Sequence, residues 1–142
     1  MARPRAGDWL EDEIAHWRDA GVGLVVSLLD AEEVDDLGLG DEAALCRRNG
    51  IAFHSFPIPD SGVPADRAAA ETVVREIVAR CAAGNGVAIH CRAGIGRSSL
   101  IAALVLRSAG LGTDQAFALI SEARGLRVPD TDEQIAWVDV ER

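Results

Sequence analysis

The sequence has no lysine, only three cysteines and no hydrophobic run long enough to cross a membrane. Its 14 basic residues are all arginine, and 23 acidic residues bring the net charge to -9. A body this acidic repels nucleic acids and anionic membrane surfaces. We therefore expect neither as a partner, and an anionic substrate would need a local basic pocket.

The cysteines Cys46, Cys81 and Cys91 are odd in number and form no paired disulfide framework. The first residues also lack the apolar core of a signal peptide. Both features indicate a reducing compartment, so we expect a cytoplasmic protein. Cys46 and Cys81 fall on predicted helices, where we expect them to pack rather than to react.

The length of 142 residues, 49% of them hydrophobic, fits one soluble domain over residues 1–142, which we expect to be a monomer. Predicted strands cover residues 22–29, 51–56 and 87–90, and predicted helices alternate with them. This alternation favours a three-layer α/β fold, with a central, mostly parallel sheet of about four to five strands flanked by helices. The apolar run 22–29 is expected at its centre.

A glycine-bearing segment, residues 90–98 with the sequence HCRAGIGRS, joins a predicted strand to a predicted helix. Its two glycines let the backbone fold tightly, so that amide groups and the positive end of the helix converge on one anion. Arg97 can add a bidentate fork to two phosphate oxygens. The segment therefore predicts a phosphate-binding loop.

Cys91 lies at the start of this loop. A free thiol is mostly protonated at neutral pH, so a nucleophilic role requires that the surroundings stabilise the thiolate. Loop amides, the helix dipole and Arg97 are the expected sources of that stabilisation, and Ser98 can donate a hydrogen bond to the sulfur. His90 is expected to be a buried structural residue that hydrogen-bonds the loop.

Residues 90–98 resemble the HCxxGxxR(S/T) signature of protein tyrosine and dual-specificity phosphatases, nearest to the kinase-associated and bacterial dual-specificity-like branches. The resemblance implies that Cys91 is the nucleophile and that no metal or cofactor is needed. It also implies hydrolysis of phosphotyrosine, with phosphoserine and phosphothreonine as further substrates, through a cysteinyl phosphate. The phosphate-binding residues it implies are Arg92, Ala93, Gly94, Ile95, Gly96 and Arg97.

The same family carries a general-acid aspartate on a loop before the nucleophile, and the resemblance assigns this role to Asp60. Asp60 lies 31 residues before Cys91, in the segment 57–64 with the sequence PIPDSGVP. Asp66 is the nearby rival, expected instead in the first turn of the next helix. A plain turn residue between prolines is the alternative reading of Asp60.

The segment 128–134 resembles the glutamine-bearing loop that positions the hydrolytic water in tyrosine-specific members, which makes Gln134 the candidate for that role. We expect Asp130 with Glu133 to cap the last helix. Two arginines precede this segment, and they either satisfy a helix C-terminus or contact the substrate; they are Arg124 and Arg127.

A phosphorylated protein or peptide is the expected substrate. Two alternatives stay open. One is a phosphatase for a non-protein ester, such as a phosphoinositide, a sugar phosphate or an RNA 5′ phosphate. The other is a phosphate-binding module that does not turn over.

Overall fold

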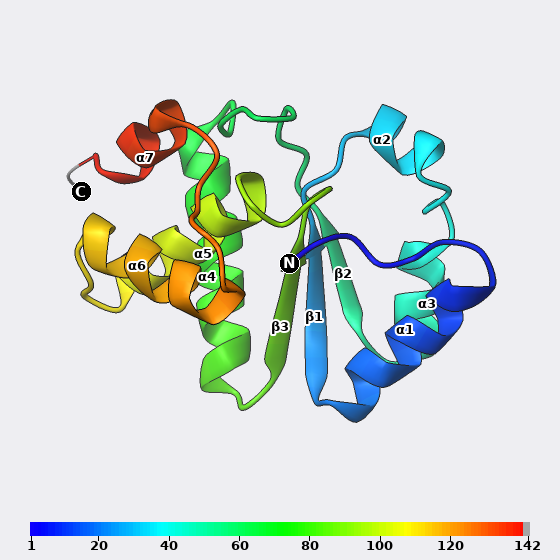
Figure 1. Ribbon diagram of the computed structural model, residues 1–142. Helices are drawn as coiled ribbons and strands as arrows, with labels where there is room; N and C mark the ends of the chain where they lie inside the picture. The colour runs from blue at the N-terminus through cyan, green and yellow to red at the C-terminus, as the bar shows by residue number, and fades with distance from the viewer. Residues whose placement is uncertain (141–142) are drawn as a thin grey trace.

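The computed structural model describes residues 1–140, so the expected domain span of 1–142 extends two residues beyond the described part. Helices and strands alternate along the chain (Figure 1). The strands are β1 (Val22–Ser27), β2 (Ala52–Ser55) and β3 (Gly86–His90). The helices are α1 (Asp8–Asp19), α2 (Ala31–Asp36), α3 (Glu42–Arg48), α4 (Arg67–Ala82), α5 (Arg97–Ser108), α6 (Thr113–Arg124) and α7 (Asp132–Val138).

The sheet has the strand order β2-β1-β3, and both pairs of neighbours are parallel. This confirms the α/β fold with a parallel sheet flanked by helices, and it confirms the central place of the run that begins at Val22. The sheet is smaller than expected, since residues 1–140 contribute three strands rather than four or five. From residue 91 to residue 140 the chain forms helices and loops only.

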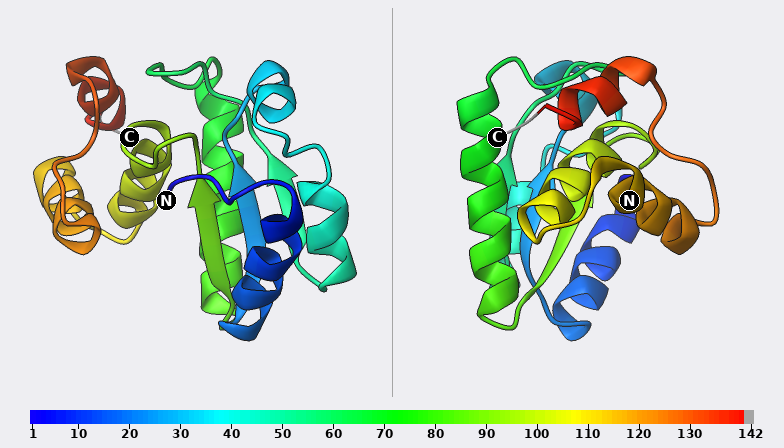
Figure 2. Two further views of the ribbon diagram at one scale, coloured as in Figure 1. Left: turned by 45° about the vertical axis from the view of Figure 1, so that its right-hand side comes forward. Right: turned by 90° about the vertical axis from the view of Figure 1, so that its left-hand side faces the viewer.

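Helices cover both faces of the sheet (Figure 2). Helices α1 and α3 pack on one face, while α4 and α5 pack on the other, with α6 and α7 against α5. Side chains of β1 alternate between the two faces, because Leu24 and Val26 join the core beneath α4 and α5, and Val25 joins the core beneath α1 and α3. Within residues 1–140, every helix is too short or too polar to cross a membrane.

The start of α1 differs from expectation. Asp8 opens a capping-box pattern in the sequence, yet the N-cap is Gly7, and no side chain caps the helix. Asp8 lies instead in the first turn, where its charge favours the helix dipole. Trp9 is 57% exposed, while Leu10 and Ile14 are buried and Trp17 packs against the same cluster.

Candidate active site

The carboxyl ends of the three strands meet at one edge of the sheet (Figure 1). Strand β1 leads to α2, β2 leads to the proline-rich segment 57–64, and β3 leads to residues 91–96, here called the Cys91 loop. In open parallel sheets this edge is where ligands bind, because segments distant in sequence converge there.

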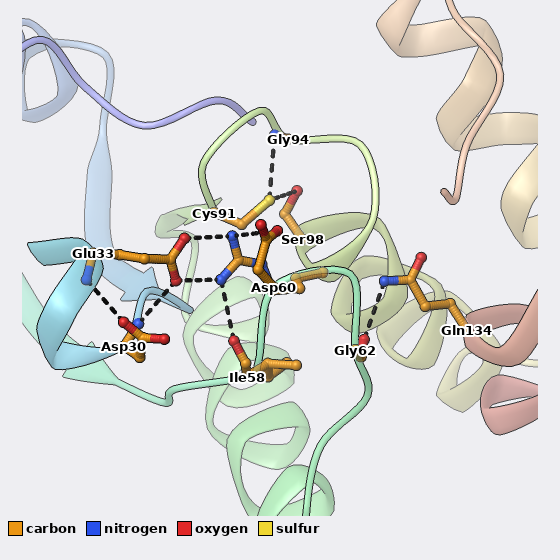
Figure 3. Close-up of polar contacts among 10 residues, drawn as sticks. Asp30, Glu33, Ile58, Asp60, Gly62, Cys91, Gly94, Ser98 and Gln134 are labelled. Atoms are coloured by element: carbon orange, nitrogen blue, oxygen red, sulfur yellow. Dashed lines mark hydrogen bonds and ion pairs between the residues drawn. The ribbon is translucent and has the colours of Figure 1, made fainter. Parts of the chain in front are cut away.

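Two polar groups contact the sulfur of Cys91, one from the Cys91 loop and one from α5 (Figure 3). Gly94 donates its backbone N–H to the Sγ atom of Cys91 at 3.2 Å, and the Oγ atom of Ser98 lies 3.4 Å from the same sulfur. Cys91 is buried, and its loop leads directly into the N-terminus of α5. A backbone N–H donor beside a helix N-terminus is the kind of surrounding in which nucleophilic cysteines are found.

Gly94 is required at its position by conformation and by space. Its φ is 75°, which favours glycine, and a Cβ atom would collide with the backbone of Met1 and Ala2. Arg124 donates a hydrogen bond from Nη1 to the carbonyl oxygen of Gly94. Arg124 was expected either as a charge at a helix end or as a substrate contact. It lies in the last turn of α6, and its side chain also holds the outer side of the Cys91 loop. Arg127 is exposed.

Arg97 is held in place by a buried carboxylate. Its Nη1 and Nη2 atoms donate to the two oxygens of Glu33 at 2.6 and 2.9 Å, and Nη1 also donates to the carbonyl oxygen of Ile58 at 3.1 Å. These hydrogen bonds lower the pKa of Glu33, while burial acts in the opposite direction. Burial is the largest single influence on the pKa of Arg97 and lowers it, but the hydrogen bonds and charge of Glu33, with smaller contributions from Cys91 and Asp60, together raise that pKa above its ordinary value. The guanidinium is therefore fixed and charged before any ligand arrives.

Glu33 is a site residue that the sequence did not single out for chemistry. Asp30 followed three residues later by Glu33 is a capping pattern in the sequence, and in the structure the two residues form a capping box at the start of α2. The available signal was position, because this pair follows the central strand directly, at the edge where the site forms.

Asp60 occupies a tight turn of residues 59–62, here called the Asp60 turn. Gly62 donates its N–H to the carbonyl oxygen of Pro59 at 2.8 Å, and Ser61 between them has a φ of 57°. The Oδ1 atom of Asp60 lies 3.3 Å from Nη2 of Arg97, and the side chain is 65% exposed. Asp66 is elsewhere, as the N-cap of α4, where its carboxylate accepts hydrogen bonds from backbone amides.

One cavity of about 230 Å³ brings the main candidates together. Its lining residues are Asp60, Ser61, Cys91, Arg92, Ala93, Ile95, Gly96, Arg97 and Asp130. Of the expected phosphate-binding residues, Gly94 is outside this lining, and its N–H is directed at the sulfur. Asp130 is a second carboxylate at the cavity that the sequence suggested only as a helix cap. In residues 1–140 no group of three His, Cys, Asp or Glu side chains is placed to hold a metal ion.

Gln134 is fully buried and is absent from the cavity lining. Its Oε1 atom accepts hydrogen bonds from the backbone N–H groups of Asp130 and Thr131 at 3.1 and 3.2 Å, and its Nε2 atom donates to the carbonyl oxygen of Gly62 at 3.1 Å. The expected cap of α7 by Asp130 and Glu133 is therefore wrong, because Thr131 and Gln134 form that capping box. The water-positioning role of Gln134 stays a prediction.

The remaining histidine and cysteine expectations have mixed outcomes. His90 is buried, but its Nε2 atom pairs with Glu42 of α3 at 2.7 Å rather than with the Cys91 loop. Cys46 is buried, and that burial raises the pKa of its thiol to about 12. Cys81 is exposed, so the expectation that it packs in the core is wrong. It lies near the C-terminal end of α4, in the last turn of the helix.

Comparison with known proteins identifies related sequences. A family described as "Polymorphic toxin system, DSP-PTPase phosphatase" matches residues 1–110. The chain is 31% identical over 128 residues to cyclin-dependent kinase inhibitor 3 of Rattus norvegicus and 32% identical over 127 residues to that of Mus musculus. Each alignment covers 77% of this chain and 60% of the relative. The chain thus spans about 60% of the length of the curated relatives it matches.

Solved structures share the fold. A kinase-associated phosphatase with its catalytic-site cysteine replaced by serine superposes with a TM-score of 0.88 at 22% identity, covering 96% of this chain and 80% of that one. Tk-PTP in its active form superposes with a TM-score of 0.75 at 28% identity, covering 89% of this chain and 81% of that one.

Proposed function

Because the chain belongs to the DSP-PTPase phosphatase family, we propose that it hydrolyses phosphotyrosine, with phosphoserine and phosphothreonine as further substrates, through a cysteinyl-phosphate intermediate. The observation that carries this proposal is the single cavity lined by Cys91, Arg97 and Asp60. A nucleophile, a phosphate clamp and an acid are the three groups that this reaction needs.

In the first step the Cys91 thiolate attacks phosphorus, and the bond from phosphorus to the ester oxygen breaks. Asp60, in its protonated form, gives its proton to the departing oxygen. The amides of the Cys91 loop and the guanidinium of Arg97 carry the negative charge of the transferring phosphoryl group. Because Glu33 already holds the guanidinium of Arg97 in place, Arg97 can stabilise this charge without losing side-chain freedom when the substrate binds.

In the second step Asp60, now a carboxylate, takes a proton from the attacking water. The new oxygen–phosphorus bond forms as the sulfur–phosphorus bond breaks, and the thiolate leaves. Ser98, whose Oγ atom lies 3.4 Å from the sulfur, donates a hydrogen bond to the thiolate as its charge returns. The cycle ends with free phosphate, the Cys91 thiolate and a protonated Asp60, which are the forms that the first step requires.

A protein substrate has support from the curated relatives at 31% and 32% identity, which are named as inhibitors of a protein, a cyclin-dependent kinase. A relative named PTPMT1 is solved in complex with PI(5)P, at 20% identity, and shares the fold alone. The test of the proposed function therefore includes a phosphoinositide beside phosphopeptides.

The test compares purified protein with Cys91→Ser and Cys81→Ser under reducing conditions. The substrates are phosphotyrosine, phosphoserine and phosphothreonine peptides, a phosphoinositide, a sugar phosphate and an RNA 5′ phosphate. We expect hydrolysis of phosphopeptides, its loss in Cys91→Ser with inorganic phosphate still bound, and no change in Cys81→Ser, because Cys81 is exposed and remote from the cavity.

Three outcomes would contradict parts of this proposal. Absence of turnover on every ester would contradict the enzymatic function. Equal activity in Cys91→Ser would contradict the covalent route. A higher kcat/KM on any non-protein ester would replace the substrate class.

A further inference from the structure

The side-chain amide of Gln134 joins three segments of the site, and its contact to Gly62 is drawn in Figure 3. Its Nε2 atom donates to the carbonyl oxygen of Gly62 in the Asp60 turn, and its Oε1 atom accepts from the backbone N–H groups of Asp130 and Thr131. It also packs on the Cys91 loop, where a Cβ atom added to Gly96 would lie 2.8 Å from Nε2. Because buried polar groups need their partners, these hydrogen bonds fix the amide strongly.

The Asp60 turn is held by a hydrogen bond on either side, and just after it Val63 packs against the main core and Pro64 is buried. Before the turn, Ile58 is buried and anchored, since its N–H donates to Leu28 and its carbonyl oxygen accepts from Arg97. After the turn, Gln134 supplies the side-chain hydrogen bond to Gly62. The carboxylate of Asp60 lies between these two anchors and is mostly exposed.

We propose that Gln134 is a positioning residue for the general acid, holding the Asp60 turn over the Cys91 loop and thereby acting on the first chemical step. This differs from the role expected from the sequence, in which Gln134 orients the water of the second step. The inference rests on the proposed function, in which Asp60 protonates the leaving oxygen.

The two roles predict different kinetics. A general acid matters most when the leaving oxygen is basic, as in phenyl phosphate, and little when it is already a good leaving group, as in a fluorinated umbelliferyl phosphate. Loss of positioning therefore lowers kcat/KM on phenyl phosphate selectively. Loss of water positioning instead slows hydrolysis of the cysteinyl phosphate. Because this step is the same for every ester, the loss does not depend on the leaving group, and the slower step enlarges the initial burst of product.

Gln134→Glu separates the two functions of the side chain. A glutamate at this position of a capping box can still accept from the backbone amides of Asp130 and Thr131. Its carboxylate cannot donate to the carbonyl oxygen of Gly62. Gln115→Glu is the matched control, because Gln115 caps α6 in the same way, accepting from the N–H of Gly112 at 2.9 Å, and α6 packs away from the Asp60 turn on α5.

We expect Gln134→Glu to lower kcat/KM about 10-fold on phenyl phosphate, a part of the roughly 10² to 10⁴ that a general acid contributes, and to change the fluorinated ester less than about 2-fold. Gln115→Glu should match the wild type on both esters. An equal loss on the two esters, or a larger burst without the leaving-group dependence, would overturn the proposal.

Hydrogen exchange tests the same contact without turnover. Amides of residues 57–64 should exchange faster in Gln134→Glu than in the wild type or in Gln115→Glu, while those of α7 keep their protection. Unchanged exchange over 57–64 would overturn the inference. If the wild type hydrolyses neither ester, the proposed function fails, and the exchange still decides whether Gln134 holds the turn.

A second pair of variants serves if Gln134→Glu does not fold. Gln134→Met keeps the shape and loses every hydrogen bond of the amide, while Thr131→Val removes the other half of the α7 capping box and leaves the contact to Gly62. Faster exchange of residues 57–64 in Gln134→Met alone supports the proposal. Equal exchange in the two variants contradicts it.

Discussion

The Cys91 loop and the Asp60 turn lie on the same cavity but are built in opposite ways. The Cys91 loop is a contiguous piece of backbone between β3 and α5, and Cys91, Gly94 and Gly96 are buried in it. The Asp60 turn carries an exposed carboxylate. The Cys91 loop is therefore a local structure that can serve as the phosphate cradle, whereas the position of Asp60 depends on side chains from distant segments of the chain.

Arg97 connects the two regions. It starts the helix that follows the Cys91 loop, and its guanidinium contacts Ile58 and Asp60 on the other side. Glu33 fixes it with two hydrogen bonds. Changes on the cradle side should therefore affect every ester alike, and changes on the acid side should depend on the leaving group.

The largest effect is expected for Arg97→Lys, on the cradle side. Lysine cannot form the two-pronged contact to a carboxylate or a phosphate, and transition-state arginines in phosphoryl transfer contribute about 10³ to 10⁵ in kcat. We expect kcat/KM to fall about 10³-fold on phenyl phosphate and on the fluorinated ester alike, as steady-state assays would measure.

The control is Arg47→Lys, an exposed change on α3, which should match the wild type. A loss in Arg97→Lys that is confined to phenyl phosphate would break the distinction between the two regions.

The second effect is expected for Asp60→Asn, on the acid side. The amide cannot give a proton to the leaving oxygen, and general acids contribute roughly 10² to 10⁴ to the rate. We expect a loss of about 10²-fold on phenyl phosphate and only a small loss on the fluorinated ester. Asp66→Asn is the matched control, because asparagine caps a helix as well as aspartate does.

Activity in Asp60→Asn that matches the wild type on phenyl phosphate would contradict the assignment of Asp60 as the acid. The same loss in Asp66→Asn would indicate that Asp66 is the acid instead.

The third effect concerns the free energy of unfolding, and it comes from the buried ion pair between Glu33 and Arg97. Removing one partner of a buried ion pair leaves the other charge unpaired, which costs about 3 to 5 kcal/mol. We expect Glu33→Gln to lower the free energy of unfolding by about 3 kcal/mol near neutral pH, measured with urea. Glu32→Gln, an exposed neighbour on α2, should change it little.

The pH dependence of the same pair has a definite sign. Arg97 lowers the pKa of Glu33 below its ordinary value of 4.5, so the stabilisation is present above that pH and is lost as the pH falls through the lower folded-state pKa. The difference in unfolding free energy between wild type and Glu33→Gln should therefore shrink on acidification below about pH 4.5. A difference that grows instead would contradict the ion pair.

Some features could be predicted because they depend on neighbours in sequence. The capping box of Asp30 and Glu33, the central strand and the α/β fold follow local rules of capping and hydrophobic runs, and the structure contains all three. The cap of α7 was misplaced by one residue, because Asp130 and Thr131 are both good N-caps and the choice depends on which of them faces Gln134.

The sequence by itself determined the Cys91 loop, because the strand, the glycines, the cysteine and the arginine are contiguous and their backbone closes on one anion site. The tertiary structure determined what holds the loop and the acid together. Glu33 reaches Arg97 across 64 residues, and Gln134 reaches Gly62 across 72. The first contact forms because parallel strands bring their carboxyl ends to one edge, and the second because α7 packs on α5. No local pattern in the sequence records which side chains meet there.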